Sequence, residues 1–129
     1  MRRLLSVVVS VYNEEEALAQ FYQVTEGILN TISWDYELVF VNDGSRDQSL
    51  SILNHLADSN PKVKVVSFSR NFGHEAAMIA GIDYSQGDGI ICMDADLQHP
   101  PACIPEIIRH FEDGYEVINM VRTKNESAG

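Results

Sequence analysis

The sequence predicts an α/β fold: a mostly parallel sheet with helices on both faces. Strand-like and helix-like segments alternate along the chain, and the strand-like runs are apolar almost throughout, as is typical of strands buried on both faces. The chain has 129 residues, of which 45% are hydrophobic and 22% are charged. This length and composition predict a single globular domain over residues 1–129.

The first half of the chain contains two predicted strands, each followed by a helix. Leu4 to Val11 is rich in Val and Leu and is typical of a strand, and residues 15–31 carry apolar side chains at helical spacing. Tyr36 to Val41 is the second predicted strand. Asp47 is placed to cap the next helix, and Asn60-Pro61 ends it.

The second half continues the alternation. Val63 to Phe68 predicts a third strand, His74 to Tyr84 a third helix, and Gly89 to Met93 a fourth strand. A helix started by proline is expected from Cys103 to Phe111, and Glu116 to Val121 is a fifth predicted strand. On the third helix we expect the buried side to consist of Ala77, Ile79, Ala80 and Ile82.

Charge and cysteine content exclude some classes of function. The formal net charge of −10 disfavours binding to nucleic acid, which needs a basic surface. No apolar run is long enough for a transmembrane helix. Cys92 lies in an apolar run and is predicted to be buried, and its spacing from Cys103 fits no metal motif. Both cysteines fit a reducing, cytosolic setting.

Polar residues gather where the first four predicted strands end. They lie in residues 12–14, 42–45, 69–74 and 94–98. The carboxyl ends of parallel strands meet at one edge of a sheet, and ligands of such sheets bind beyond that edge. The sequence therefore predicts a functional site built from these four loops.

The acids after the fourth strand predict a cation. Asp94 and Asp96 stand two residues apart beside a buried strand, and an unpaired buried carboxylate is costly. Hard oxygen ligands suit Mg²⁺ or Mn²⁺, and Gln98 could add an amide oxygen. The alternative is a loop with two solvated aspartates.

The other loop residues each allow two interpretations. Asp43 could accept a hydrogen bond from a nucleobase or form a turn before Gly44. Tyr12 could stack on a base or pack the loop, and Glu14 could face a ligand or favour a helix N-terminus. His74 could donate to a phosphate or cap its helix. Asn42 and Ser45 are read as turn or cap groups.

Arg70 is the basic side chain nearest the expected site. A guanidinium suits recognition of a phosphate or a base, and the alternative is a surface salt bridge. The glycine-rich dinucleotide motif and the Walker-type phosphate loop are both absent from the sequence.

Together these loops resemble the amino-terminal part of the inverting family 2 glycosyltransferases, which have the Rossmann-like GT-A fold. The closest resemblance is to the polyprenyl-phosphate subgroup, which includes dolichol-phosphate mannose synthases and bactoprenol glucosyltransferases. The matching segments, in order along the chain, are Val8 to Glu15, Val41 to Asp47, Ser69 to His74 and Asp94 to Pro101.

The resemblance implies roles for residues. Asp96, Gln98 and Asp94 would hold Mg²⁺ or Mn²⁺, and Arg122 and Lys124 would lie near the acceptor phosphate. The donor, a nucleotide-diphosphate sugar, would be bound by Val11, Tyr12, Glu14, Asp43, Arg70, Asp94, Ala95 and Asp96.

The resemblance also implies an activity and a location. The full-length enzyme would transfer a sugar from a nucleotide-diphosphate sugar, with UDP favoured and GDP-mannose possible, to a polyprenyl phosphate such as undecaprenyl phosphate. It would work at the cytoplasmic face of the cell membrane, held there by regions outside this chain. Two alternatives are a non-catalytic nucleotide-sugar binding module and a family 2 transferase with a saccharide acceptor.

The family continues beyond the point where this sequence ends, to a further acid that serves as the base, to an acceptor loop and often to membrane helices. We therefore expect the chain to be a C-terminally truncated, soluble, donor-binding half of the domain. It should bind nucleotide and metal without turnover. The resemblance does not indicate an oligomeric state.

Overall fold

The computed structural model describes residues 3–95, 101–112 and 117–119. Four residues of the predicted site, Asp96, Gln98, Arg122 and Lys124, lie outside these described residues. The remaining predicted site residues lie within them.

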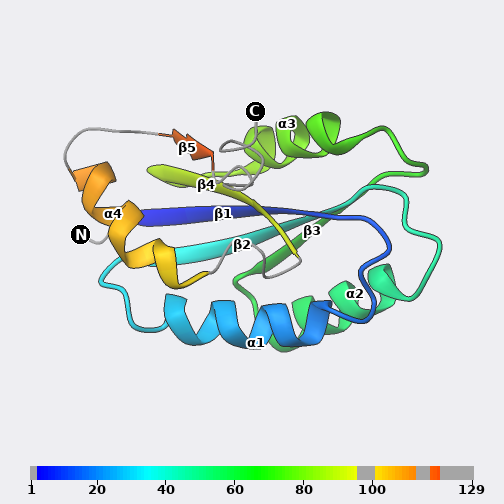
Figure 1. The fold of residues 1–129 in the computed structure, drawn as a ribbon, viewed down its shortest axis with the longest axis horizontal. Helices are drawn as coiled ribbons and strands as arrows, with labels where there is room; N and C mark the ends of the chain where they lie inside the picture. Colours follow the sequence, from blue (N-terminus) through cyan, green and yellow to red (C-terminus); the bar gives the residue numbers. More distant parts are fainter. Residues whose placement is uncertain (1–2, 96–100, 113–116, 120–129) are drawn as a thin grey trace, which may run out of the picture.

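A parallel sheet of five strands forms the centre of the molecule, in the order β3-β2-β1-β4-β5 (Figure 1). This arrangement confirms the predicted α/β fold with a parallel sheet, and the predicted bounds of the first four strands are correct to within one residue. The strands are β1 (Leu4–Val11), β2 (Asp35–Asn42), β3 (Val63–Ser67), β4 (Gly89–Asp94) and β5 (Val117–Asn119).

Helices cover both faces of the sheet. Helices α1 (Leu18–Leu29), α2 (Ser49–Ser59) and α4 (Ile104–Glu112) lie on one face, and α3 (His74–Tyr84) lies on the other (Figure 1). A short 3-10 turn, η1 (Pro101–Cys103), precedes α4. Helix α1 begins three residues later than predicted, because the carbonyl of Glu14 accepts hydrogen bonds from the N–H groups of Ala17 and Leu18 in a turn.

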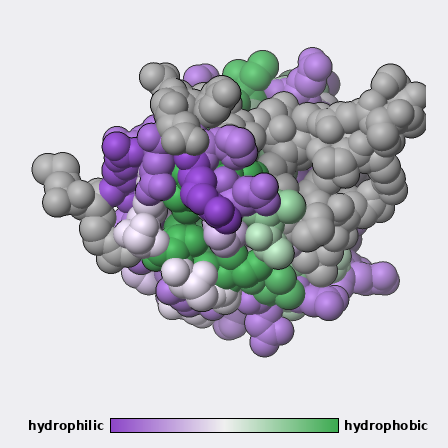
Figure 2. All heavy atoms as spheres, turned by 60° about the vertical axis from the view of Figure 1, so that its left-hand side comes forward, coloured by the Kyte–Doolittle hydropathy of each residue, from purple (hydrophilic) through white to green (hydrophobic). Residues whose placement is uncertain are grey.

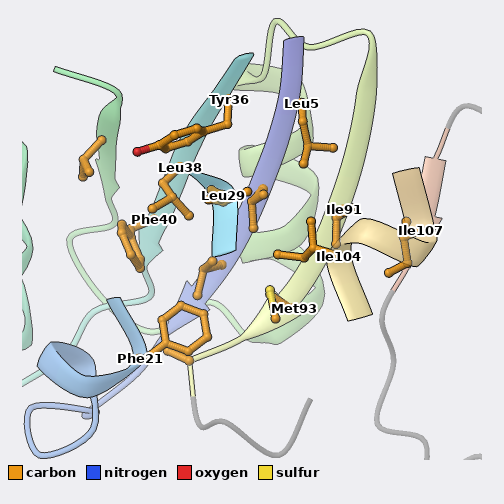
Figure 3. Packing of buried hydrophobic residues seen from close by; sticks show 14 of the residues in the cluster. Leu5, Phe21, Leu29, Tyr36, Leu38, Phe40, Ile91, Met93, Ile104 and Ile107 are labelled. Carbon is orange, nitrogen blue, oxygen red and sulfur yellow. The ribbon is translucent and has the colours of Figure 1, made fainter. Parts of the chain in front are cut away.

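The strands bury side chains on both faces, as their apolar sequences predict. The larger cluster joins β1, β2 and β4 to α1 and α4 and includes Phe21, Phe40, Met93 and Ile104 (Figure 3). A smaller cluster on the other face joins Val8, Val39, Val41 and Cys92 to α3. The two clusters hold the sheet rigidly beneath the loops at its edges.

The predicted buried side of α3 is partly wrong. Ala77 is fully buried and Ile82 packs against the smaller cluster, but Ile79 is 61% exposed. Ala77 and Gly81 are one helical turn apart and face the sheet, whereas Ile79 lies two residues from each and so points away. The helix approaches so closely that a Cβ on Gly81 would lie 2.3 Å from Cγ1 of Val8. The buried residues of α3 are therefore Ala77, Gly81 and Met78, and the sequence analysis did not predict Met78.

The opposite end of the sheet carries the amino-terminal ends of the strands. Figure 2 turns this side forward and shows hydrophobic residues at its centre, bordered by hydrophilic ones. A cavity of about 230 Å³ lies here between the end of α1 and α4, lined by Ile32, Pro105 and Ile108 among others. Among the residues that the structure describes, no helix has the length and apolar character needed to cross a membrane.

Candidate functional site

The strand register brings the four polar loops to one edge. Val11 pairs with Asn42, Asn42 pairs with Ser67, and Ser10 pairs with Asp94. The four strands therefore end side by side, and the loops after β1, β2 and β3 lie along the edge on the right of Figure 1. This is the edge at which open parallel sheets bind ligands.

The loop after β1 is tied to the loop after β2. The N–H of Asn13 donates to Oγ of Ser45 at 2.9 Å, and Oδ1 of Asn13 accepts from the N–H of Arg46 at 2.8 Å. The N–H of Glu14 donates to Oγ of Ser49 at 2.9 Å. Asn13 has a φ of 54°, a left-handed conformation that asparagine tolerates better than most residues. The two loops thus form one hydrogen-bonded unit.

Asp47 stands two residues before α2 begins and serves both loops. Its Oδ1 accepts from the N–H of Ser49 at 2.9 Å, and its Oδ2 accepts from the N–H of Glu15 at 3.1 Å. Desolvation raises the pKa of Asp47, but the hydrogen bonds from Ser49 and Glu15 outweigh it and hold the pKa below its ordinary value. The N-cap of α2 is Gln48 and not Asp47, but the carboxylate of Asp47 still accepts from the first N–H of the helix. The bond to the first loop was not indicated by the sequence.

Asp43 is bound by the loop after β3. The residue is only 3% exposed, and its Oδ1 accepts from the N–H of Phe72 at 2.7 Å. Its Oδ2 accepts from the N–H of Gly73 at 3.1 Å and from Nδ2 of Asn71 at 3.0 Å. Both oxygens of the buried carboxylate therefore accept hydrogen bonds, which offsets the cost of burying its charge. Sequence reasoning missed this role, because the partners lie 28 to 30 residues away.

Gly44 allows the loop after β2 to approach the loop after β3 closely. It has a φ of 71°, and a Cβ at this position would lie 2.2 Å from the carbonyl carbon of Arg70 and 2.4 Å from the nitrogen of Asn71. Only glycine fits such a close approach of two backbones. The Asp-Gly pair of the sequence is the one available signal of this contact.

A cavity of about 370 Å³ opens between the ends of β2 and β3. Tyr12, Ser67 and Arg70 are among its lining residues. Tyr12 is 45% exposed, and the guanidinium of Arg70 lies 4.6 Å from the centre of the Phe72 ring, which orients it by a cation–π contact. An aromatic ring and a guanidinium beside backbone groups suit a planar, anionic ligand.

Asn42 lines this cavity and is held by two hydrogen bonds. Its Oδ1 accepts from the N–H of Ser45 at 3.2 Å, and its Nδ2 donates to Oγ of Ser67 at 3.1 Å. Asn42 thereby closes the turn after β2, as predicted. Val11 is fully buried, and its carbonyl accepts from the N–H of Asp43 at 2.8 Å.

Asp94 ends β4 and meets α3. Its Oδ1 lies 2.7 Å from Nε2 of His74 and accepts from Oγ of Ser10 at 3.3 Å. Neither interpretation of His74 from the sequence included this contact. Ala95, which follows Asp94, is fully buried.

The predicted metal ligands are only partly described. Asp96 and Gln98 lie outside the described residues, and among the residues that the structure does describe, no group of three or more His, Cys, Asp or Glu could hold a metal ion. Asp94 alone of the predicted ligands is placed, and its carboxylate is a hard oxygen donor of the kind that Mg²⁺ and Mn²⁺ take.

Cys92 is not a functional group of this edge. It is 2% exposed on β4, and burial raises the pKa of its thiol to about 11. The prediction that Cys92 is a buried small hydrophobe is confirmed, whereas Cys103 is exposed.

Comparison with known proteins decides the family. The family model described as "Glycosyl transferase family 2" matches residues 6–129. The chain belongs to this family. The family resemblance seen in the four loops is thereby confirmed.

Curated relatives in family 2 are similar over nearly the whole chain. An uncharacterized glycosyltransferase, YkcC of Bacillus subtilis, is 49% identical over 94% of the chain, and the prophage bactoprenol glucosyl transferase homolog of Escherichia coli is 43% identical over 97%. The bactoprenol glucosyl transferase of Shigella phage SfV is 42% identical over 97%. The chain spans 38% of the length of the first of these relatives and 41% of the other two.

Solved structures share the fold. Staphylococcus aureus TarS 1-349 in complex with UDP-GlcNAc superposes with a TM-score of 0.65 at 21% identity, over 86% of this chain and 32% of that one. The mannosyltransferase PcManGT of Pyrobaculum calidifontis, in complex with GDP-Man and Mn²⁺, gives a TM-score of 0.61 at 22% identity, over 74% of this chain and 28% of that one. These likenesses agree with the predicted GT-A fold.

Proposed function

We propose that this chain is the donor-binding part of a glycosyltransferase that transfers a sugar from a nucleotide-diphosphate sugar to a polyprenyl phosphate. One observation carries the proposal: two relatives named for bactoprenol glucosyl transfer are 42% and 43% identical over 97% of the chain. Bactoprenol is a polyprenol, so these names support a polyprenyl phosphate as the acceptor. A full-length protein acting on such an acceptor would work at the cytoplasmic face of the cell membrane.

The donor nucleotide would lie along the edge described above. The base would enter the cavity lined by Tyr12 and Arg70. Asp43 stands between two lining residues, Asn42 and Gly44, and Glu14 would contact the donor from the loop after β1. A carboxylate has about four lone-pair positions, so the three hydrogen bonds that Asp43 accepts from the loop leave it able to accept from a base as well. The backbone of Val11 and Ala95 would line the path toward the sugar. We favour UDP over GDP as the nucleotide.

The diphosphate would lie at the β4 end, where Asp94, Asp96 and Gln98 would hold Mg²⁺ or Mn²⁺. These are hard oxygen donors, which both ions accept. Such an ion, when bound, stabilises the charge of the departing nucleoside diphosphate. The structure of PcManGT with GDP-Man and Mn²⁺ supports a divalent ion for this fold.

The acceptor phosphate would be drawn toward the sugar by Arg122 and Lys124. Its oxygen would attack the anomeric carbon while the bond to the nucleoside diphosphate breaks, which inverts the configuration at that carbon. A phosphate oxygen is already anionic at neutral pH and needs little help from a base.

Calorimetric titration tests the donor half of the proposal. UDP should bind the chain in the presence of Mn²⁺ and lose most of its affinity in EDTA, and GDP should bind more weakly. Asp96→Ala should abolish the dependence on Mn²⁺. Metal-dependent binding that survives Asp96→Ala would show that the metal assignment is wrong.

A transfer assay tests the activity itself. With a radiolabelled UDP-sugar and undecaprenyl phosphate, we expect the 129 residues alone to bind the donor without turnover. Rapid sugar transfer by the 129 residues alone would contradict the expectation that this part of the domain binds the donor without turnover. If a protein of the relatives' full length bound donor without transfer to any acceptor, the chain would be a non-catalytic nucleotide-sugar binding module.

A further inference from the structure

A hydrogen bond joins the start of α3 to the end of β4. His74 is the first residue of α3, and its Nε2 lies 2.7 Å from Oδ1 of Asp94, the last residue of β4. Ser10 of β1 donates to the same oxygen at 3.3 Å. The side chain of His74 is 48% exposed and that of Asp94 is 17% exposed. Two neighbouring elements thus hold one carboxylate oxygen.

The backbone on each side of His74 is fixed. Before it, the N–H groups of Phe72 and Gly73 donate to the buried carboxylate of Asp43, and Gly73 has a φ of 105°, a conformation that favours glycine. After it, α3 is held close to the sheet through Ala77 and Gly81. Because the backbone of His74 is already ordered, its hydrogen bond to Asp94 costs little additional backbone entropy.

We propose that His74 is a positioning residue that holds the Asp94 carboxylate in the orientation in which it meets the nucleotide-sugar donor and its metal ion. This inference rests on the proposed function for the role of Asp94, but the contact itself does not. The bond restrains rotation of the carboxylate, because a donor on Oδ1 fixes where the second oxygen lies. Residues that orient a metal-coordinating side chain in this way usually increase the affinity for the metal, although they do not contact the metal themselves.

The contact requires a proton on Nε2 of His74, because the carboxylate of Asp94 can only accept a hydrogen bond. Gln can replace such a donor, since its amide nitrogen reaches about as far as Nε2 of histidine, whereas Ala cannot. Comparison of the two substitutions therefore distinguishes the effect of losing the hydrogen bond from the effect of losing the volume of the ring.

The binding experiment compares His74→Ala, His74→Gln and the control His55→Ala, which removes an exposed histidine on α2. We expect His74→Ala to weaken Mn²⁺-dependent UDP binding about tenfold, in the range typical of groups that orient metal ligands. His74→Gln should restore most of that affinity, and His55→Ala should leave it unchanged. Wild-type affinity in His74→Ala, or no rescue by His74→Gln, would overturn the proposal.

Nitrogen-15 NMR of the histidine rings tests the contact without any ligand. In the unliganded chain the hydrogen-bonded Nε2–H of His74 should give a downfield proton signal that is protected from exchange, and Asp94→Ala should remove this signal. An Nε2–H signal that is missing from the wild type, or that is unchanged in Asp94→Ala, would overturn the inference even if UDP binds. Failure of the wild-type chain to bind UDP with Mn²⁺, together with the expected Nε2–H signal, would instead contradict the proposed function and leave Asp94 held by His74 for another ligand.

Discussion

Asp43 accepts two backbone N–H groups and one side-chain amide from the loop after β3. The sequence allowed two roles for Asp43, base recognition and turn formation. The structure shows a third role, which is to bind the loop after β3. It could not be foreseen, because nothing in the sequence indicates which backbone groups 29 or 30 residues away will face a carboxylate. A buried acid with these partners stabilises the fold whether or not it also binds a base.

Asp43→Asn tests this structural role. The new amide puts a donor where the loop also presents donors, so at least one N–H of Phe72 or Gly73 loses its acceptor. Because an unpaired buried polar group costs on the order of 1–3 kcal/mol, we expect the free energy of unfolding in urea to fall by about 2 kcal/mol. Asp83→Asn on the exposed side of α3 is the control and should change it by less than about 0.5 kcal/mol. Equal stability of the two variants would contradict the role assigned to Asp43.

The two cysteines should differ sharply in reactivity. Burial raises the pKa of Cys92 to about 11, so that at pH 8 only about one thiol in a thousand is ionised, whereas Cys103 is exposed. Ellman's reagent at pH 8 should therefore label Cys103 quickly and Cys92 only after denaturation. Rapid labelling of both thiols in the folded chain would contradict the burial of Cys92.

The same pKa shift makes the free energy of unfolding depend on pH in the alkaline range. The ordinary pKa of the thiol is 9.0, so between about pH 9 and pH 11 the unfolded chain releases the Cys92 proton and the folded chain keeps it. The contribution of Cys92 is thus complete below pH 9 and is lost as pH rises toward 11. The free energy of unfolding of Cys92→Ala, measured over this range, should fall less steeply than that of the wild type.

At the scale of elements, apolar patterning was a good guide to strands and a weaker guide to helix faces. The bounds of β1 and α3 match the predictions because an apolar run and a glycine-bounded helix leave little choice. The buried side of α3 was less predictable, since Ala77 and Gly81 face the sheet and Ile79 does not. Hydrophobicity alone ranks Ile79 first, but the direction in which each side chain points from the helix decides which residues are buried, and Ile79 points away from the sheet.

The contact between the loops after β2 and β3 is tested by Gly44→Ala. A residue other than glycine with a φ of 71° is strained, and the new Cβ would lie 2.2 Å from the Arg70 carbonyl carbon. We expect a loss of about 2 kcal/mol or more in the free energy of unfolding, and weaker UDP binding because the Arg70 loop must shift.

Gly27→Ala in α1 is the matched control, since a Cβ there meets nothing within 4 Å. It should be neutral or stabilise the chain by up to about 1 kcal/mol, because alanine favours a helix interior. If Gly44→Ala were tolerated as well as Gly27→Ala, the close approach of the two loops would be wrong.

At the scale of the whole molecule, the site could be located before its contacts could be known. A parallel sheet brings the ends of β1, β2, β3 and β4 to one edge, so the polar residues that follow each strand had to converge. The hydrogen bonds that link these loops in series, from Asn13 to Ser45, from Asp43 to Gly73 and from His74 to Asp94, depend on backbone detail that no sequence pattern encodes. These bonds connect the loops after β1, β2 and β3 and the end of β4 into one frame.

A crystal structure of the chain with UDP and Mn²⁺, with the anomalous signal of manganese recorded, would locate the nucleotide and the metal in one experiment. We expect an anomalous peak beside Asp94 and Asp96, and density for uracil in the cavity lined by Tyr12 and Arg70. Manganese and UDP bound away from this edge, or no binding at millimolar concentrations, would contradict the proposed donor site.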